Sequence, residues 1–368
     1  MVRIVSWNVN GLRTLKPSLK AVFESLQADI VCVQETRISQ SDVDLERLAL
    51  VPGYESFFSF CSVRNGYSGV ATFTKNGLPS NGRGAINLTP RDAGEGLANA
   101  IGGAAINVIP DLSTTQGLEA SCCNEGNLAP CIPLSVSADE LELIRREGRV
   151  VITDHERFVL INVYLPAVSV DGRAKFKLAV CRALELKVRA LREAGRSVVI
   201  VGDFNIAPTS CDVAEPVDDM SSFNSRPSRQ WLRNVLLGEI GLKDSFRELH
   251  PSFTSAYTCW SEATRARENN FGARIDLILV DEELFHAQVV AASILCDVTG
   301  SDHCPISLEL RAGIMGCCMA MNTPPPFCTR YLPRFSAKQL SIRDMLDCGS
   351  HAGQEPFDDS SRSKRRRS

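Results

Sequence analysis

The sequence predicts an α/β protein in which sheets and helices form stacked layers. Short runs rich in Val and Ile alternate with segments of helical spacing, which is typical of layered α/β domains. The chain has 368 residues, 44% of them hydrophobic and 23% charged, and is long enough for a large buried core. At about 150 residues per domain this length suggests two domains, but one large layered domain can occupy most of it.

The elements expected before residue 76 alternate between strand and helix. The first strand is closed by Asn10 and Gly11, a pair typical of a turn, and the second ends in polar side chains. Strands are expected at residues 2–9, 29–34 and 69–73, and a helix at residues 18–27. Residues 76–134 are rich in Gly, Asn, Pro and Ala with little periodicity, which predicts a long loop-rich insertion.

Regular patterns resume after the insertion. Ser137 and Glu140 form a capping-box pattern at the start of an amphipathic helix that ends near Gly148. The strands expected next are residues 149–153, 157–165, 197–203, 274–280 and 305–311, and the helices are residues 175–194 and 228–237. Residues 313–368 are rich in Pro, Ser and Arg, which predicts a flexible basic tail behind one domain of residues 1–312.

Charge and composition exclude several classes of protein. The formal net charge is −3, and residues 313–368 carry 9 basic and 5 acidic side chains, so the main body is acidic. No apolar run approaches the roughly 18 residues that span a bilayer, and the N-terminus turns polar too soon for a signal peptide. The 14 cysteines make no C-x-x-C pair and no zinc-type Cys/His spacing, which favours reduced thiols over a disulfide framework.

Polar side chains gather at the ends of the predicted strands. They are Asn8, Asn10, Gln34, Glu35, Tyr164, Asp203, Asn205, Asp276, Asp302 and His303. Asp and Asn at strand ends often only start turns, but buried carboxylates are costly unless they are paired or bind a metal. One shared pocket at the rim of a sheet is the simplest explanation for so many of them. Four other histidines, His155, His250, His286 and His351, have no motif around them and are expected at the surface.

The side chains expected in this pocket favour a hard divalent cation. Carboxylate and amide oxygens without a Cys/His cluster suit Mg²⁺, with Mn²⁺ as the alternative. A metal that neutralises phosphate oxygens, with a histidine beside it, is the outline of a site that hydrolyses phosphate esters. The sequence therefore favours a phosphoesterase.

Seven motifs occur in order along residues 1–312 and together resemble one known family. They are residues 6–13 (Ser-Trp-Asn-Val-Asn-Gly-Leu-Arg), 33–37 (Val-Gln-Glu-Thr-Arg), 66–70 (Gly-Tyr-Ser-Gly-Val), 162–166 (Asn-Val-Tyr-Leu-Pro), 202–205 (Gly-Asp-Phe-Asn), 274–276 (Arg-Ile-Asp) and 300–305 (Gly-Ser-Asp-His-Cys-Pro). This order resembles the exonuclease III family of apurinic/apyrimidinic endonucleases. The resemblance implies a four-layer α/β sandwich, with two mixed sheets face to face, helices outside and the active site at one edge.

The resemblance also assigns roles to the residues at the strand ends. Glu35 and Asp302 would hold the principal metal, and the wider metal-binding set would include Asn8, Asp203, Asn205 and His303. Asp203 would orient or deprotonate the attacking water, and Asn205 would support the phosphate. Tyr164 would contact the phosphate or the leaving oxygen, and His303, oriented by Asp276, would bond to the scissile phosphate. Asn10 would lie near the principal metal. Apart from these roles, Asn10 is expected to contact DNA, and Arg274 is a candidate for a contact with its phosphates because of its charge.

The family resemblance implies a substrate as well, namely double-stranded DNA with abasic sites or 3′ ends in base excision repair. Efficient abasic-site endonucleases line the pocket for the flipped-out sugar with bulky aromatic side chains. The matching positions here are Cys259 and Ala273, which predicts a looser pocket. We therefore expect 3′→5′ exonuclease or 3′-phosphodiesterase activity to exceed abasic-site incision.

The tail suggests partners and a compartment. The basic block at residues 364–367 is consistent with import into the nucleus, with the cytoplasm or mitochondria as alternatives. Residues Gln339 to Leu346 faintly resemble the peptide that docks on the sliding clamp of replication, although an ordinary amphipathic turn is the simpler reading. The enzyme is expected to be a monomer without membrane contact.

Two other functions stay open at this point. The first is another phosphoesterase of the same superfamily, acting on inositol phosphates or lipids; the motifs at residues 7–11 and 66–69 favour DNA over these. The second is a catalytically inactive scaffold for DNA repair. The presence of Glu35, Asp203, Asp276 and Asp302 counts against it, because such a scaffold is expected to have lost a catalytic carboxylate.

Overall fold

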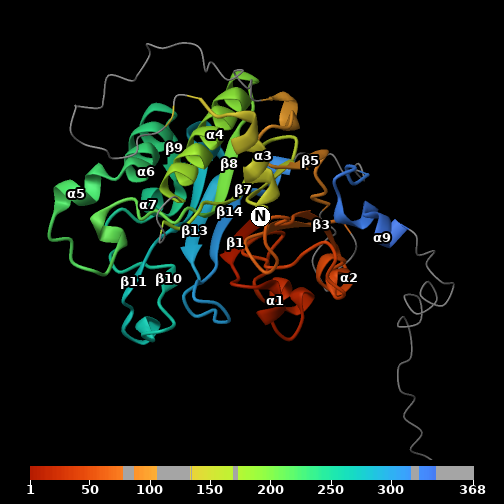
Figure 1. Ribbon diagram of the computed structural model, residues 1–368, viewed down its shortest axis with the longest axis horizontal. Helices are drawn as coiled ribbons and strands as arrows, with labels where there is room; N and C mark the ends of the chain where they lie inside the picture. The colour runs from red at the N-terminus through yellow and green to blue at the C-terminus, as the bar shows by residue number, and fades with distance from the viewer. Residues whose placement is uncertain (78–86, 106–132, 134, 169–172, 316–322, 337–368) are drawn as a thin grey trace, which may run out of the picture. The chain divides into compact units, whose positions relative to one another are not determined.

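The computed structural model describes residues 1–77, 87–105, 133, 135–168, 173–315 and 323–336. The chain divides into a compact unit at Met1–Arg330 and a second unit at Tyr331–Ser368. The first unit holds both large sheets (Figure 1).

Two six-stranded mixed sheets form the centre of the unit. In the first, the strands lie in the order β13-β14-β1-β2-β4-β3, and in the second β5-β6-β7-β8-β12-β9. The strands of the first sheet are β1 Val2–Asn8, β2 Ile30–Gln34, β3 Tyr54–Ser59, β4 Val70–Lys75, β13 Val289–Ile294 and β14 Ile306–Leu310. Those of the second are β5 Asp92–Glu95, β6 Val150–Asp154, β7 Val159–Tyr164, β8 Val198–Asp203, β9 Leu242–Asp244 and β12 Asp276–Asp281. Each sheet has one parallel pair, β1 with β2 and β7 with β8.

Successive side chains of a strand point to opposite faces of the sheet, and in the buried strands this produces two separate hydrophobic cores. On β8, Val199 and Val201 pack with Val2 and Ile4 of β1, which fills the space between the two sheets. The side chains between them point to the opposite face, where Ile200 packs against the helices. Both faces of the second sheet are therefore covered, which explains why its strands read as continuous apolar runs.

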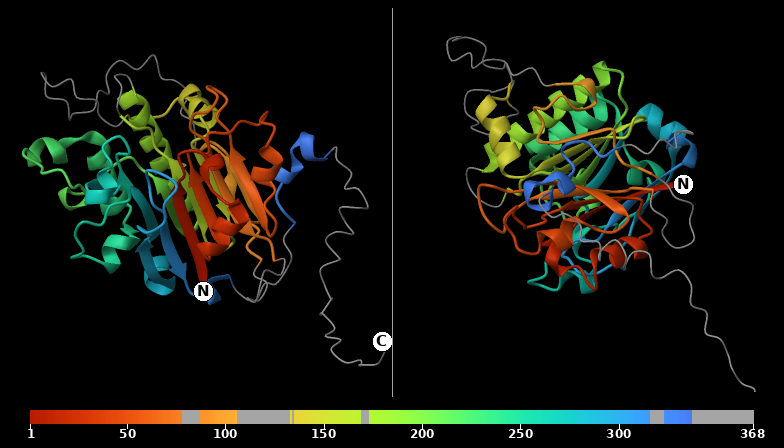
Figure 2. Two further views of the ribbon diagram at one scale, coloured as in Figure 1. Left: turned by 90° about the horizontal axis from the view of Figure 1, so that it is seen from below. Right: turned by 90° about the vertical axis from the view of Figure 1, so that its right-hand side faces the viewer.

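Helices cover the outer faces of both sheets. Helices α3 (Ala138–Arg146) and α4 (Arg173–Glu193) lie on one side of the sheets and α1 (Leu19–Ser25) on the other (Figure 2). On α1, the ring of Phe23 lies 5.0 Å from that of Phe73 on β4, which anchors this helix to the first sheet. The four-layer α/β sandwich is confirmed.

The remaining elements are short. The other helices are α2 Leu45–Ala49, α5 Met220–Ser225, α6 Pro227–Gln230, a π-helix at Trp231–Glu239, α7 Ser245–Leu249, α8 Glu282–Gln288 and α9 Pro333–Ser336. Short 3₁₀ turns lie at Leu12–Thr14, Ile101–Gly103, Ser210–Asp212, Ala266–Asn269, Ala312–Met315 and Thr329–Tyr331. Strands β10 (Cys259–Trp260) and β11 (Gly272–Ala273) form a separate two-stranded sheet. Among the residues described, no helix combines the length and the apolarity that a bilayer span requires.

Several boundaries differ from the sequence prediction. The capping box of Ser137 and Glu140 is present, but the helix expected from residue 228 begins at Pro227 and continues as a π-helix. The described parts of residues 76–134 are not only loop, because they supply edge strand β5 and the fully buried side chains of Leu88 and Leu97.

The tail also differs near its start. The compact unit extends to Arg330, beyond the boundary at residue 312 that composition suggests, and Cys328 is only 2% exposed. Arg330 forms an ion pair with Glu55 of β3, which binds this segment to the first sheet. Residues 339–346 and 364–367, with the predicted clamp-docking peptide and basic block, lie outside the described residues.

Candidate active site

The site lies where strand ends from both sheets meet. Asn8 ends β1, Tyr164 ends β7 and Asp203 ends β8. Strand β12 runs antiparallel to β8 and begins with Asp276, which lies directly opposite Asp203 in the register. The parallel pairs β1–β2 and β7–β8 and the antiparallel strand β12 thus bring residues that are far apart in the sequence to one rim.

Asn8 connects the two sheets at this rim. Its Nδ2 donates hydrogen bonds to Glu35 Oε1 and to Asp203 Oδ2, each at 3.0 Å. Its Oδ1 accepts a bond of 3.1 Å from the backbone N–H of Asn10. A single fully buried amide therefore fixes the positions of two carboxylates that belong to different sheets.

Glu35 accepts hydrogen bonds on both carboxylate oxygens. Tyr164 donates its hydroxyl to Oε1 at 2.8 Å, and Arg37 donates two N–H groups to Oε2 at 3.1 and 2.7 Å. Burial raises the pKa of Glu35, and the hydrogen bonds from Asn8, Arg37 and Tyr164 lower it by a larger amount. The net shift of the pKa is therefore downward, and the carboxyl group is ionised. Burial and the charges of Glu35 and Asp203 raise the pKa of Tyr164, which keeps its hydroxyl protonated as a donor.

Asp203 is buried, and the nearby carboxylate of Asp276 repels its negative charge. Its Oδ1 accepts the backbone N–H of Asn205 at 2.8 Å, and its Oδ2 accepts the Asn205 amide at 3.1 Å in addition to Asn8. Burial and the nearby charge of Asp276 raise the pKa of Asp203 well above that of an ordinary aspartate. Such a carboxylate is suited to accept a proton from water, or to share a cation.

His303 and Asp276 form a buried pair next to Asp203. Nδ1 of His303 lies 2.8 Å from Asp276 Oδ2, and Thr258 donates its hydroxyl to the same oxygen at 2.6 Å. Burial opposes protonation of His303, but the charge and hydrogen bond of Asp276 raise its pKa well above the ordinary value. The pair is therefore an imidazolium oriented by Asp276, as the sequence predicts, and the side chain of Cys259 forms a further hydrogen bond with His303.

Asp302 approaches the same region from the segment before β14. The hydroxyl of Ser301 lies 2.8 Å from the backbone oxygen of Asn8 and 3.1 Å from Asp302 Oδ1. Ser301 therefore links Asp302 to Asn8 at the end of β1, and the side chain of Asn8 bonds to Glu35. The ligand atoms of Asp302, His303 and Cys259 all lie within 4.8 Å of one another.

The oxygen-rich donors at this rim fit a divalent cation. Ligand atoms of Asp203, Asp276 and His303 lie within 4.8 Å of one another. Asn10 Oδ1 and Asp276 Oδ1 are buried and have no hydrogen-bond partner among the described residues, and a cation is one way to satisfy such oxygens. A cation on Glu35 would share its carboxylate with Arg37, because Arg37 already bonds to Oε2.

Arg274 is not placed to contact DNA, which corrects the prediction for this residue. The side chain is 1% exposed, its Nε bonds to Asp212 at 2.7 Å and its Nη2 lies 2.8 Å from Asp244. The buried guanidinium holds the loop after β8 against β9 instead of facing solvent. Asn10 is partly exposed beside Asn8, and its contact with DNA stays a prediction.

Three supporting residues were not among the site residues that the sequence predicts, although Ser301 lies within the motif of residues 300–305. Thr258 and Ser301 hold Asp276 and Asp302 as described above. Arg149 is fully buried; it donates to the backbone oxygen of Tyr164 at 3.0 Å and lies 4.9 Å from the centre of that tyrosine ring. The contacts of Thr258 with Asp276, of Arg149 with Tyr164 and of Ser301 with Asn8 join different segments of the chain, and no local spacing could reveal them.

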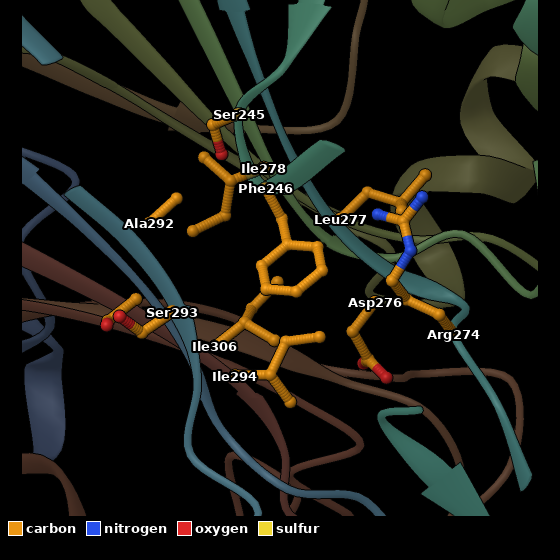
Figure 3. Close-up of a pocket in the computed structure, with 11 residues that line it drawn as sticks. Ser245, Phe246, Arg274, Asp276, Leu277, Ile278, Ala292, Ser293, Ile294 and Ile306 are labelled. Atoms are coloured by element: carbon orange, nitrogen blue, oxygen red, sulfur yellow. The ribbon is translucent and has the colours of Figure 1, made fainter. Parts of the chain in front are cut away.

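A small cavity of about 10 Å³ lies behind the site, among β12, β13, β14 and α7. The ring of Phe246 occupies the centre of its lining residues, with Asp276 and Arg274 at one side (Figure 3). The volume is about that of one water molecule, so this cavity is part of the core and does not receive a substrate.

Buried carboxylates, an oriented histidine and donors for an anion at one rim define a phosphoesterase-type site in a four-layer sandwich. Residues 5–303 match the endonuclease/exonuclease/phosphatase family, and the chain belongs to this family.

Several relatives make the comparison more specific. The chain is 35% identical to DNA-(apurinic or apyrimidinic site) endonuclease 2 of Xenopus laevis over 94% of this chain and 66% of that protein. It is 28% identical to the exodeoxyribonuclease of Bacillus subtilis over 84% of this chain and 100% of that protein. The crystal structure of the Xenopus laevis APE2 catalytic domain matches with a TM-score of 0.72 and 35% identity, over 92% of this chain and 99% of that one. The predicted family resemblance is confirmed, and the chain spans about 66% of the length of the curated endonuclease 2 relatives.

Proposed function

We propose that this protein is a Mg²⁺-dependent phosphodiesterase of base excision repair that acts on double-stranded DNA. The observation that carries the proposal is the rim where the His303–Asp276 pair lies beside Asp203 and the Asn8–Glu35 bond. Asn8, Glu35, Asp203, Asn205 and Asp302 supply the oxygen donors for Mg²⁺ or Mn²⁺. When bound, the cation would neutralise charge on the phosphate and on the leaving oxygen.

The chain's own residues then have separate tasks. Asp203, with its raised pKa, accepts a proton from the attacking water or orients it. His303, held as an imidazolium by Asp276, donates Nε2–H to a phosphate oxygen, and Tyr164 donates its hydroxyl to the same group. Asn205 keeps Asp203 in place through two hydrogen bonds.

We further propose that processing of 3′ ends exceeds incision at abasic sites. Cys259 of β10 pairs with Ala273 of β11, and Cys259 also forms a bridge with His303. Cys259, opposite the catalytic histidine, and Ala273, the partner of Cys259 on β11, therefore carry small side chains, which grip a flipped-out abasic sugar less than aromatic rings would. The names of the relatives include both an abasic-site endonuclease and an exodeoxyribonuclease, so both activities need to be measured.

The test compares two DNA duplexes, one with a recessed 3′ end and one with an abasic site, under the same conditions. Mg²⁺ should support cleavage of both, EDTA should abolish it, and Asp203→Ala should reduce it by at least about 10²-fold. Asp297→Ala, a change at an exposed carboxylate, is the matched control and should keep full activity. Trimming faster than incision supports the preference, incision faster than trimming contradicts it, and no metal-dependent cleavage of either duplex contradicts the proposed function.

Partners and compartment are proposals from the sequence alone. We propose a monomeric enzyme that enters the nucleus through residues 364–367 and has a weak sliding-clamp contact through residues 339–346. Deleting each segment separately should reduce nuclear accumulation in the first case and clamp binding in the second.

A further inference from the structure

A cysteine lies among the reactive groups of the site. Among the described residues, Cys259, Asp302 and His303 bring a thiol, a carboxylate and an imidazole nitrogen within 4.8 Å of one another. The thiol comes from β10 and the other two ligands from the segment before β14, more than 40 residues later. This distance explains why no zinc-type spacing is visible in the sequence.

The backbone fixes this arrangement. The N–H of Trp260 donates to the backbone oxygen of Asp302 at 2.9 Å, and the N–H of Cys304 donates to that of Thr258 at 2.8 Å. These two bonds enclose an antiparallel bridge between Cys259 and His303. Residues directly opposite each other across such a bridge have Cβ atoms about 4.5–5.5 Å apart, so thiol and imidazole meet without a change of backbone.

The ligand atoms of the three residues converge at one place, where the Cys259 side chain already forms a hydrogen bond with His303. Nδ1 of His303 bonds to Asp276, which fixes the ring and leaves Nε2 as the ligand atom. A histidine whose second nitrogen is held by a carboxylate is the usual form of a metal-binding histidine. Cys259 and Asp302 are both partly exposed, so an ion can reach the group from solvent.

We propose that Cys259, His303 and Asp302 bind one Zn²⁺ ion through Sγ, Nε2 and a carboxylate oxygen. A thiolate, an imidazole and a carboxylate are the three ligand types that zinc prefers, whereas Mg²⁺ has little affinity for sulfur. In tetrahedral coordination these ligand atoms lie roughly 3.4–3.6 Å apart, within the separation that the structure allows. Binding releases the thiol proton of Cys259 and the Nε2 proton of His303 to solvent, and the fourth position stays open to water or a phosphate oxygen.

Zinc at this position would inhibit the reaction of the proposed function. It would take Nε2 of His303 away from the phosphate and compete for Asp302, which is among the proposed Mg²⁺ ligands. The site therefore makes the enzyme sensitive to zinc in the presence of excess Mg²⁺. This inhibitory effect depends on the proposed function, but zinc binding itself does not.

The binding test uses the full chain without DNA. Co²⁺, a spectroscopic substitute for zinc, is titrated in excess Mg²⁺ while the near-ultraviolet thiolate-to-cobalt band is recorded. We expect a band that saturates at one equivalent, disappears when Zn²⁺ is added, and is lost in Cys259→Ser. Cys296→Ser, a change at an exposed cysteine, should keep the band. A band of equal size in Cys259→Ser, or none in the unmodified protein, overturns the proposal.

Two further measurements complete the test. X-ray absorption of the zinc-loaded unmodified protein should show one sulfur at about 2.3 Å with nitrogen and oxygen neighbours, and this decides the question if Cys259→Ser does not fold. A shell of nitrogen and oxygen alone overturns the proposal. In nuclease assays, each variant is compared with its own zinc-free rate. The Zn²⁺ concentration for half inhibition should rise by about tenfold or more in Cys259→Ser, and an unchanged value overturns the inhibitory role.

Discussion

At the scale of single residues, Asp203 combines a catalytic position with an environment that opposes its charge. It is buried and lies opposite Asp276, so removing its charge relieves a repulsion while removing the proposed base. We expect Asp203→Asn to lose at least about 10²-fold in activity and to melt in EDTA at the same temperature as the unmodified protein or higher. Activity assays and thermal unfolding in EDTA check the two parts, and a lower melting temperature would contradict the electrostatic argument.

His155 is a correction to the sequence analysis, because this histidine is buried instead of lying at the surface. Its Nε2 lies 2.9 Å from the Thr153 hydroxyl, and its ring stacks on Phe158 at 5.1 Å. Burial lowers the pKa of His155 to about 4, although the charge of Asp154 partly offsets this effect. The exposed neighbours in the sequence, Glu156 and Arg157, gave no sign of a buried ring.

The depressed pKa of His155 predicts a loss of stability in acid. The unfolded chain binds the proton near pH 6.5, while the folded chain resists it down to about pH 4, so stability is complete above about 6.5 and falls between these values. This group would contribute up to about 3 kcal/mol to the decrease. Urea unfolding at several pH values should show a smaller decrease for His155→Gln and an unchanged one for His286→Gln, whose side chain is 66% exposed. Equal slopes for all three proteins would contradict the prediction.

The sequence was more successful at predicting which polar residues belong to the site than at predicting which residues they contact. Motifs at strand ends identified Asn8, Glu35, Tyr164, Asp203 and Asn205, which the structure joins by hydrogen bonds. The same reasoning misjudged Arg274, because its partners Asp212 and Asp244 are 62 and 30 residues away. A charged residue within a functional motif can form buried ion pairs in the core instead of binding substrate, and only its ion-pair partners in the structure show which of the two it does.

At the scale of elements, the long helices and the central strands were predictable because each carries its own periodicity, whereas the buried edge strand β3 was missed. Strand β13 was missed, since only one of its six residues is buried and its alternation is weak. Edge strand β5 was missed for a similar reason, because its four residues, Asp-Ala-Gly-Glu, lack the β-branched side chains typical of strands. Short edge strands depend on their neighbours in the sheet more than on their own sequence.

Gly202 on β8 tests how closely β7 and β8 approach each other. Its φ is +142°, and a Cβ atom there would lie 1.9 Å from the backbone oxygen of Val163. We expect Gly202→Ala to destabilise the protein by more than about 3 kcal/mol, because the clash is with backbone and cannot relax without breaking the strand pair next to Asp203. Gly195→Ala is the control: its φ is +70° but nothing lies within 4 Å, so it should cost about 1 kcal/mol in urea unfolding. Similar losses for both variants would refute the packing argument.

At the scale of the whole molecule, the site depends on the alignment of two sheets that meet through a polar contact in an apolar core. Gln34 of β2 donates to Asn162 Oδ1 at 2.8 Å, and Asn162 of β7 donates to the backbone oxygen of Ala71 at 2.9 Å. Both side chains are fully buried. Gln34 directly precedes Glu35, and Asn162 lies two residues before Tyr164, so this contact sets the distance between the two functional groups.

Asn162→Leu should therefore affect stability and activity together. Loss of the amide leaves buried donors and acceptors on β2 and β4 without partners, which we expect to cost about 2–4 kcal/mol in urea unfolding. The bond of 2.8 Å between Tyr164 and Glu35 crosses from one sheet to the other, so a small slip should also lower kcat by about tenfold or more at a temperature where the variant is still folded. Thr74→Val is the matched control, because the buried Thr74 hydroxyl on β4 has no hydrogen-bond partner within the described part of the chain, and its removal should leave both quantities unchanged or raise stability. If Asn162→Leu lost stability but kept full kcat, the two sheets would be aligned by their apolar packing alone.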